Sequence, residues 1–434
     1  MTDVIIRKSS SLKGEVYAPP SKSYTQRMLI AAFLSKGKSK ISRPLVAEDT
    51  DATLRAVRSL GAKVAVSEDL WEVKGSLALK SPIRPIDCGD SGATLRFMIP
   101  VAALAPNSSV FTLGPSLAKR PVEPLLRSLR QLGVEAIFKD ARGKPSILVR
   151  GGGISGGKTT IPGDVSSQFV SGLMFACPLA REDTEITIST PLESKSYVQM
   201  TEQVLDEHGI RVGISQDFRR LHIPAKQTYK PRDHTVPGDY SAASFLLGAG
   251  AVTNSKIRVY NLDPETLQGD KAIIEILKKM GVNSNVHSDH IDLEETSGLL
   301  EAVEVDVNDV PDLAPVCTVL ACYAKGTSKI RNALRLKYKE SNRLSALYLE
   351  LKKMGAEIEL DENSLTVKGP CSLHGAVIDP HNDHRIAMAC AVAALGASGK
   401  TTIRNVECVR KSYPRFFTDL HTLGADVIGW ELDR

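Results

Sequence analysis

The chain has 434 residues, of which 42% are hydrophobic and 24% are charged, and its formal net charge is +5. This composition is typical of a soluble globular protein with room for two domains. The charge excess is too small to indicate nucleic-acid binding on its own. No apolar run approaches the ~18 residues of a membrane span, and the N-terminus lacks a signal peptide. The seven cysteines form no CxxC pair, which favours buried, reduced thiols in a cytosolic protein.

A glycine at the end of a predicted helix recurs six times, roughly every 70 residues, a longer period than that of the usual solenoid repeats. Each glycine follows an amphipathic stretch, such as 271–280, and precedes an alternating apolar run, such as 356–360. Glycine readily adopts the left-handed conformation that ends a helix, so the pattern predicts six helix–Gly–strand endings. The glycines are Gly61, Gly133, Gly209, Gly281, Gly355 and Gly424.

Each unit also has a first half, in which an apolar helix follows a polar or glycine-rich turn and precedes a β-branched strand. These helices are apolar on nearly every face, which predicts that they are buried. The unit is therefore roughly βαβαββ, and six units fit two closed domains of three units better than an open array. In chain order the apolar helices are predicted within 21–34, 89–105, 163–180, 238–252, 312–324 and 383–397.

Side chains with an oxygen atom stand at the predicted starts of most of these apolar helices. Such residues accept hydrogen bonds from free backbone N–H groups of the first helical turn, so they are predicted N-caps. They are Ser21, Asp164, Asp239, Asp312 and Asp383.

Basic residues gather at the same junctions between turn and helix. Lys22 stands in the first turn of its predicted helix, Arg27 follows just over one turn later, and Arg385 opens another helix. A cation at a helix N-terminus opposes the helix dipole, so a purely structural helix would carry Asp or Glu there. We therefore expect an anion at two or three of these starts. The others would be simple caps or solvated charged turns.

Eight short motifs occur in an order that resembles one enzyme family, the 5-enolpyruvylshikimate-3-phosphate synthases or 3-phosphoshikimate 1-carboxyvinyltransferases. Any one motif is weak, but the ordered set is specific and spans nearly the whole chain. The motifs are Lys22-Ser23…Arg27, Gly89-Asp90-Ser91-Gly92, Arg120-Pro121, Ser166-Ser167-Gln168, Ser194-Lys195-x-Tyr197, Pro311-Asp312, Lys339-Glu340-x-x-Arg343 and Asn382-Asp383-His384-Arg385.

The resemblance implies a two-domain inside-out α/β barrel with six βαβαββ repeats, three per domain. The buried helices would be parallel, with their N-termini toward an interdomain cleft. The family's chain begins in one domain, crosses to build the other and returns. The implied crossings near Pro19-Pro20 and Thr235-Val236 give a discontinuous domain of residues 1–19 and 236–434 and an inserted domain of residues 20–235.

The resemblance also implies an activity. The family moves the enolpyruvyl group of phosphoenolpyruvate to the 5-hydroxyl of shikimate 3-phosphate and releases phosphate, a step of aromatic amino-acid biosynthesis. The C3 methylene is protonated, the hydroxyl attacks C2, and phosphate leaves a tetrahedral intermediate. No metal ion or other cofactor is required. The implied partners are the two anionic substrates and the inhibitor glyphosate, with no nucleic acid or membrane, and the implied form is a cytoplasmic monomer.

The residues that match the family's motifs carry implied roles. Glu340 would donate the proton to C3, and either Asp312 or Lys22 would be the base at the hydroxyl, a choice that the sequence leaves open. Shikimate 3-phosphate would be bound by Lys22, Ser23, Arg27, Ser166, Ser167, Gln168, Ser194, Asp312 and Lys339. Phosphoenolpyruvate would be bound by Lys22, Gly92, Arg120, Gln168, Arg343, Arg385 and Lys411.

Some positions depart from the family pattern. Asp90 stands where many members have Asn, and a carboxylate beside an anion is unfavourable unless it turns away as a cap. Arg335 replaces an Asn of some members, so its role stays open. His381 and His384 form an HxxH-like pair, but without a third ligand in the motif a structural role is expected rather than metal binding.

Two other functions compete with this interpretation. UDP-N-acetylglucosamine enolpyruvyl transferases share the fold and phosphoenolpyruvate, but they usually have a Cys in the loop that corresponds to 113–120, where this chain has none. A repeat protein that binds nucleic acid through its basic turns belongs to a different class. It gives no reason for Glu340 and Asp312 among the cations.

Overall fold

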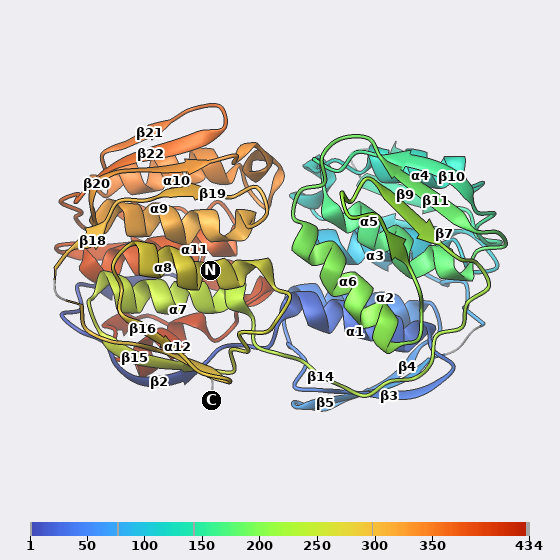
Figure 1. Cartoon of the computed structure of the whole chain (residues 1–434), viewed down its shortest axis with the longest axis horizontal. Helices are drawn as coiled ribbons and strands as arrows, with labels where there is room; N and C mark the ends of the chain where they lie inside the picture. Colours follow the sequence, from blue (N-terminus) through green and yellow to red (C-terminus); the bar gives the residue numbers. More distant parts are fainter. Residues whose placement is uncertain (1, 76–77, 142–143, 297, 431–434) are drawn as a thin grey trace. The chain divides into compact units, whose positions relative to one another are not determined.

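The computed structural model describes residues 2–75, 78–141, 144–296 and 298–430. The chain folds into two compact units of similar size. Unit 1 comprises Met1–Pro20 and Pro237–Arg434, and unit 2 comprises Ser21–Val236. Both units combine helices with mixed sheets (Figure 1), so the α/β class predicted from the sequence is confirmed.

The sheets of unit 2 share one plan among the described residues: a parallel pair of strands is followed by two antiparallel pairings. The three strand orders are β14 (His234–Thr235), β3 (Gly37–Ser42), β5 (Leu70–Gly75), β4 (Lys63–Val66); β6 (Ile86–Asp87), β7 (Ser109–Thr112), β9 (Lys144–Val149), β8 (Ala136–Ala141); and β10 (Gly157–Ile161), β11 (Thr184–Ile188), β13 (Arg220–Ile223), β12 (Gly213–Ile214).

The described sheets of unit 1 repeat this plan, and one of them has a fifth strand. The first sheet has the strand order β2 (Lys13–Tyr17), β15 (Lys256–Tyr260), β17 (His290–Leu293), β16 (Ser284–Val286). In the second sheet, β18 (Leu300–Glu301) and β19 (Glu304–Asp306) both pair with β20 (Ala324–Arg331), and β22 (Ser364–Gly369) and β21 (Ile358–Leu360) follow. The third sheet has the order β23 (Val377–Ile378), β24 (Lys400–Ile403), β1 (Val4–Arg7), β25 (Val427–Ile428).

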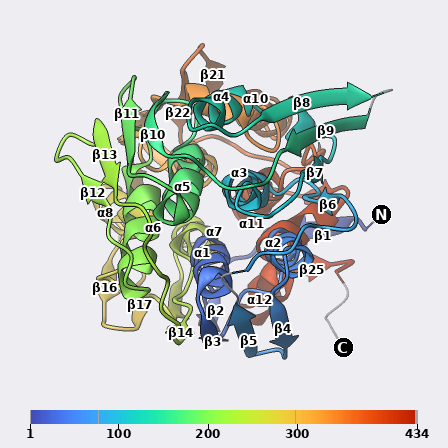
Figure 2. The ribbon, with the colours of Figure 1, turned by 90° about the vertical axis from the view of Figure 1, so that its right-hand side faces the viewer.

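The apolar helices predicted to be buried are buried along nearly their whole length, because they have no polar face to present to water. They are α1 (Lys22–Leu34), α3 (Gly92–Ala102) and α5 (Ser167–Ala176) in unit 2, and α7 (Tyr240–Val252), α9 (Ala314–Tyr323) and α11 (His384–Gly396) in unit 1. Figure 2 shows the three helices of unit 2 with the strands of that unit around them. We call these six the inner helices.

Amphipathic helices complete the two units. They are α2 (Glu48–Ser59), α4 (Glu123–Gln131), α6 (Lys195–Glu207), α8 (Ile273–Lys279), α10 (Arg343–Lys353) and α12 (Phe416–Thr422). The glycine that follows each of them has a positive φ, between 76° and 109°. After α2, Gly61 N donates to Arg58 O at 3.1 Å and Ala62 N to Val57 O at 3.0 Å, and the same two bonds recur after the other five helices. These are Schellman endings at the left-handed position that the sequence predicts.

The predicted N-caps divide into two groups. Ser21, Asp239 and Asp383 accept hydrogen bonds from the first-turn backbone of their helices, as predicted. Asp164 does not cap α5, because the turn continues for two more residues and Ser166 is the cap. The prediction for Asp312 is also wrong: it lies inside the 3-10 turn Pro311–Leu313, and its carboxylate pairs with Arg343 instead.

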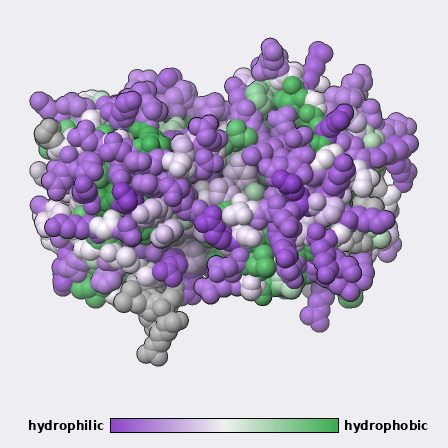
Figure 3. All heavy atoms as spheres, turned by 60° about the horizontal axis from the view of Figure 1, so that its bottom comes forward, coloured by the Kyte–Doolittle hydropathy of each residue, from purple (hydrophilic) through white to green (hydrophobic). Residues whose placement is uncertain are grey.

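The surface is mostly hydrophilic on the face drawn in Figure 3, where apolar residues form small separate groups. Each unit has its own apolar core, built from its inner helices and the inward faces of its sheets. None of the helices in the described part of the chain is long and apolar enough to cross a membrane.

Candidate active site

The start of α1 places Lys22 and Arg27 in different environments. Lys22 Nζ donates to Asp49 Oδ2 at 2.9 Å, and Asp49 is a buried residue in the first turn of α2. Arg27 is buried, and its guanidinium donates to Thr201 Oγ1 at 2.9 Å and to the Ser23 and Tyr197 carbonyls at 3.0 Å. Burial lowers the pKa of Arg27 to about 10, still high enough to keep its charge at neutral pH. Arg27 thus joins α1 to the start of α6.

Two guanidinium groups surround the first residue of α3. A Cβ on Gly92 would lie 3.2 Å from Arg120 Nη1, 3.4 Å from Arg96 Nη1 and 3.5 Å from Gln168 Oε1. Arg96 also donates to Gln168 Oε1 at 2.7 Å, and Arg120 to Ser116 Oγ at 3.2 Å. The free backbone N–H groups at a helix start and two nearby cations together form an anion-binding arrangement.

Arg96 is a functional candidate that the sequence analysis missed. It follows Gly92 by four residues on α3, so both lie on one face of that helix. Its Nη1 also reaches Ser166 Oγ at 3.4 Å, at the start of α5. The spacing of four residues between Gly92 and Arg96 is the sequence pattern that could have identified Arg96.

Asp90 has a structural partner that explains its departure from the family pattern. Its Oδ1 accepts hydrogen bonds from Ser116 N at 3.0 Å and Leu117 N at 2.9 Å. The carboxylate therefore caps the short 3-10 helix Leu117–Lys119 that precedes Arg120. It is thus a cap of this 3-10 helix, whereas Ser91 caps α3.

Serine residues occupy several of these helix starts. Ser166 accepts from Gln168 N at 3.3 Å as the cap of α5, and Ser167 is the first residue of that helix. Ser23 lies in the first turn of α1. Ser194 precedes α6 in the left-handed conformation, with φ 54°. The predicted residues of unit 2 therefore all lie at or near the N-terminal ends of α1, α3, α5 and α6, Arg120 excepted, which precedes α4.

In unit 1 one guanidinium joins three carboxylates. Arg343 opens α10, and only 1% of its side chain is exposed. Its Nε donates to Asp383 Oδ2 at 2.8 Å, its Nη1 to Asp312 Oδ1 at 2.8 Å and its Nη2 to Glu340 Oε2. The carboxylates come from the cap of α11, the turn before α9 and the turn before α10. Such a fork fixes the two predicted catalytic carboxylates relative to each other.

Asp312 has two further cationic partners. Arg385 Nη2 lies 3.1 Å from its Oδ2, and Lys339 Nζ lies 3.5 Å from its Oδ1. Burial would raise the pKa of Asp312, but Arg385, Lys339 and Arg343 together hold it well below its ordinary value. Burial, in turn, lowers the pKa of Lys339 to about 8. The predicted Lys411 is buried at the end of the 3-10 helix Val406–Lys411, which packs on α11.

The remaining candidates of unit 1 have other partners. His381 Nε2 lies 2.9 Å from Glu350 Oε1, whereas His384 is buried with its Nδ1 3.8 Å from Asp383 Oδ1. The HxxH-like pair therefore interacts with two separate carboxylates. Arg335 Nη2 donates to Asn308 O at 2.6 Å.

Asp270 is a second residue that the sequence analysis missed. It lies in the short 3-10 helix Gly269–Ala272 and is buried. Burial, followed by the nearby charge of Asp312, raises the pKa of Asp270 to about 7, against the lowering effect of Arg385. No sequence pattern marks Asp270, because its electrostatic interaction with Asp312 joins residues 42 positions apart.

Asp270→Asn should remove a pH-dependent loss of stability. From about pH 4 to pH 7 the unfolded chain releases the Asp270 proton while the folded chain keeps it, so wild-type stability falls as the pH rises. We expect the variant to gain at most about 4 kcal/mol over the wild type at pH 8 and little at pH 4. Urea unfolding at both pH values measures this, with exposed Asp361→Asn as the control. An equal effect at both pH values would contradict it.

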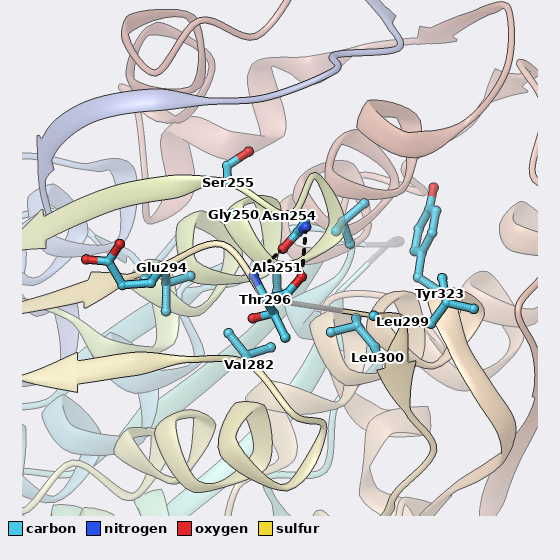
Figure 4. A pocket seen from close by; sticks show the side chains of 13 residues that line it. Gly250, Ala251, Asn254, Ser255, Val282, Glu294, Thr296, Leu299, Leu300 and Tyr323 are labelled. Carbon is cyan, nitrogen blue, oxygen red and sulfur yellow. Dashed lines mark hydrogen bonds between the residues drawn. The ribbon is translucent and has the colours of Figure 1, made fainter.

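A pocket at the C-terminal end of α7 differs from this arrangement (Figure 4). Asn254 and Thr296 exchange hydrogen bonds of 2.8 and 3.1 Å at its wall, and apolar residues such as Leu293 and Leu300 line it. Its one charged lining residue, Glu294, is an anion paired with Lys256 at 2.9 Å. The lining residues that the structure describes therefore offer no positive charge to an anionic ligand.

Comparisons with known proteins agree with the predicted family. The sequence model of EPSP synthase (3-phosphoshikimate 1-carboxyvinyltransferase) matches residues 6–420. The chain is 42% identical over 427 residues to the 3-phosphoshikimate 1-carboxyvinyltransferase of Methanocaldococcus jannaschii, covering 98% of this chain and 99% of that one. For the protein of the same name from Methanocella arvoryzae the identity is 43% over 420 residues, covering 96% and 98%.

A solved structure supports the same conclusion. EPSP synthase from Acinetobacter baumannii matches with a TM-score of 0.83 and 25% identity, and the match covers 98% of this chain and 99% of that one. The likeness in fold and the likeness in sequence therefore both extend over nearly the whole chain. The chain belongs to the EPSP synthase (3-phosphoshikimate 1-carboxyvinyltransferase) family.

Proposed function

We propose that this member of the family transfers the enolpyruvyl group of phosphoenolpyruvate to the 5-hydroxyl of shikimate 3-phosphate through the residues described above. The observation that carries this assignment of residues is the guanidinium of Arg343, which joins Asp312 and Glu340, the two predicted proton-transfer groups. Both substrates carry a phosphate and a carboxylate. Cations that bind these groups must stand beside a proton donor and a base, and unit 1 holds all three.

The predicted residues form two overlapping groups, one for each substrate. Lys22, Ser23, Arg27, Ser166, Ser167, Gln168, Ser194, Asp312 and Lys339 would bind shikimate 3-phosphate. Lys22, Gly92, Arg120, Gln168, Arg343, Arg385 and Lys411 would bind phosphoenolpyruvate. Arg96 joins the second group, because its Nη1 would lie 3.4 Å from a Cβ on Gly92, against 3.2 Å for Arg120 Nη1. The hydroxyl groups at the starts of α1, α5 and α6 suit the phosphate of shikimate 3-phosphate, since hydroxyls and backbone N–H groups donate to its oxygens.

The proton path uses the carboxylates of unit 1. Glu340 gives its proton to C3 of phosphoenolpyruvate, and the 5-hydroxyl attacks C2 while Asp312 takes the hydroxyl proton. The tetrahedral intermediate then returns a proton from the new methyl group to the Glu340 carboxylate, and phosphate leaves with the proton that Asp312 had taken from the hydroxyl. With three cations beside it, Asp312 is a weak base. An anionic substrate on the same cations would raise its pKa, so substrate binding itself prepares the base.

Lys22 remains the alternative base. Its ammonium is paired with Asp49 at 2.9 Å, which favours the charged form. Acting as a base requires that it first lose a proton, so the geometry favours Asp312 for that role and Lys22 for binding.

Phosphate release tests the function and separates it from its rivals. We expect phosphate release from phosphoenolpyruvate with shikimate 3-phosphate and none with UDP-N-acetylglucosamine. The reverse preference would assign the chain to the sister activity. No release with either acceptor would exclude both transferase activities.

The finer features of the fold belong to the same proposal. Units 1 and 2 would be the family's two domains, divided near residues 19–20 and 235–236, and each would be an inside-out barrel of three βαβαββ repeats. All seven cysteines are free thiols, as suits a cytoplasmic enzyme. A monomer is proposed because three repeats give each unit its own core, and sedimentation velocity measures this.

We also propose that glyphosate binds in the phosphoenolpyruvate site, and that Gly92→Ala weakens its binding more than it weakens the binding of phosphoenolpyruvate. The added methyl would lie within 3.5 Å of Arg120, Arg96 and Gln168, so their side chains must shift by a few tenths of an ångström. Glyphosate is the longer anion and tolerates less displacement of these groups. We expect its inhibition constant to rise by a larger factor than the KM for phosphoenolpyruvate. Equal factors would mean that the glycine serves only the start of α3.

A further inference from the structure

One outer sheet face of unit 1 carries an unusual group of polar residues. In the sheet of β2, β15, β17 and β16, side chains alternate between the core and the outside. Val259 and Ile291 point inward and are buried. His290 and Asp292, on the same strand as Ile291, therefore point outward together, two residues apart.

The turn between β16 and β17 adds a second histidine to this face. His287 N donates to His290 O at 2.9 Å, which closes the turn and places the two residues opposite each other. Their rings stack with centroids 4.2 Å apart and an interplanar angle of 13°. Asp292 Oδ2 lies 3.5 Å from His287 Nε2 and 3.9 Å from His290 Nε2. Two imidazoles and one carboxylate oxygen are thus gathered at the end of the hairpin.

These separations match those of metal ligands. In a tetrahedral zinc site with bonds of about 2.0–2.2 Å, two ligand atoms lie ~3.4 Å apart. The three atoms here all lie within 4.8 Å of one another, so an ion between them requires the two stacked rings to turn and the three atoms to move closer together. Three protein ligands would leave a fourth position for water.

A neighbouring carboxylate supplies the outer contact that metal-binding histidines usually have. Asp289 Oδ1 lies 2.6 Å from His290 Nδ1. When Nδ1 donates to this carboxylate, Nε2 keeps its lone pair, and the ring is oriented toward the other two ligands.

The third ligand is held in place from β15. Arg258 is the cross-strand partner of Asp292 and donates to both of its oxygens, at 2.6 and 2.9 Å. These hydrogen bonds fix the orientation of the Asp292 carboxylate. Oδ2 retains a second lone pair for an ion, although Arg258 competes for its charge.

We propose that His287, His290 and Asp292 form a binding site for a divalent first-row transition metal ion, with Zn²⁺ the best match to two imidazoles and one carboxylate. The ion would tie β16 to β17 at the end of their hairpin. None of the three residues belongs to the candidate active site, so the ion would stabilise unit 1 without entering the reaction.

Calorimetric titration of the full chain with ZnCl₂ tests the proposal. We expect one ion per chain, and we expect His287→Asn, His290→Asn and Asp292→Asn each to weaken binding by at least the ~10- to 100-fold known for supporting residues of metal sites. His222→Asn is the matched control, since His222 also faces a carboxylate from an exposed strand, Asp183 Oδ2 at 3.6 Å, but has no second histidine. Cys371→Ser controls for the least buried thiol.

Three results of these experiments would contradict the proposed metal site. Unchanged affinity in the three ligand variants, loss of binding in His222→Asn or Cys371→Ser, or no binding at millimolar zinc would each overturn the proposal. Zinc should also raise the midpoint of thermal unfolding of the wild type but not of His290→Asn. Phosphate release by the ligand variants should equal that of the wild type, and the titration result stands whether or not the proposed transferase activity is found.

Discussion

Glu340→Gln is expected to lower kcat by ~10²–10⁴-fold, the usual cost of losing a positioned acid. The amide has nearly the shape of the carboxylic acid but no transferable proton. Its oxygen can still accept the hydrogen bond that Arg343 Nη2 gives to Glu340. The substitution therefore removes the chemistry at this position and keeps the local contacts.

Binding of shikimate 3-phosphate separates this role from a structural one. We expect its Kd in Glu340→Gln to stay within a few-fold of the wild-type value, because Glu340 is assigned no contact with this substrate. Glu359→Gln, at an exposed position of β21, should leave both kcat and Kd unchanged. Turnover within a few-fold of wild type in Glu340→Gln would remove this residue from the mechanism. A large loss of both turnover and binding would instead indicate a disturbed active site.

Local sequence rules predicted the helix ends but not every contact at them. Glycine after each amphipathic helix predicted the six Schellman endings, because only backbone geometry is involved. The cap at Asp312 failed because the 3-10 turn Pro311–Leu313 contains this residue and precedes α9, so Asp312 does not stand at the start of the helix, and its carboxylate pairs with Arg343.

The residues that the sequence analysis missed show where such rules end. Asp270, and Asp49, which the sequence analysis likewise did not single out, become important only through partners far along the chain: Asp312 for Asp270, and Lys22 on the neighbouring helix α1 for Asp49. Neither sits in a motif, and each would be an ordinary acidic residue if exposed. Motif order, by contrast, predicted the catalytic candidates, because it reports a whole family's chemistry rather than a local conformation.

Arg343→Met is expected to cause the largest loss of stability, about 3–5 kcal/mol for unit 1, the range for breaking a buried ion pair. Methionine replaces the bulk of the side chain without its charge. Asp312 keeps Lys339 and Arg385 as partners. Asp383, whose side chain is 0% exposed, would lose its only cationic hydrogen-bond donor among the described residues.

Fluorescence can report this loss from unit 1 alone. The chain has two tryptophans, Trp71 in unit 2 and Trp430 in unit 1, where Trp430 packs on Phe417. In a Trp71→Phe background, urea unfolding followed by the remaining tryptophan measures the stability of unit 1. Arg331→Met is the matched control, because Arg331 also pairs with two carboxylates, Glu304 and Asp306, but is exposed. It should cost no more than about 1 kcal/mol.

A second substitution identifies the cause of the loss. If the cost of Arg343→Met arises from the unpaired charge of Asp383, then Asp383→Asn in the same chain should restore part of the stability, because the amide carries no charge and can still cap α11. The deficit of Arg343→Met should also grow from pH 5 to pH 8, since the ionised form of a buried, unpaired carboxylate is the costly one. A double variant no more stable than the single one, together with a deficit independent of pH, would mean that Arg343 stabilises unit 1 by packing rather than by its charge.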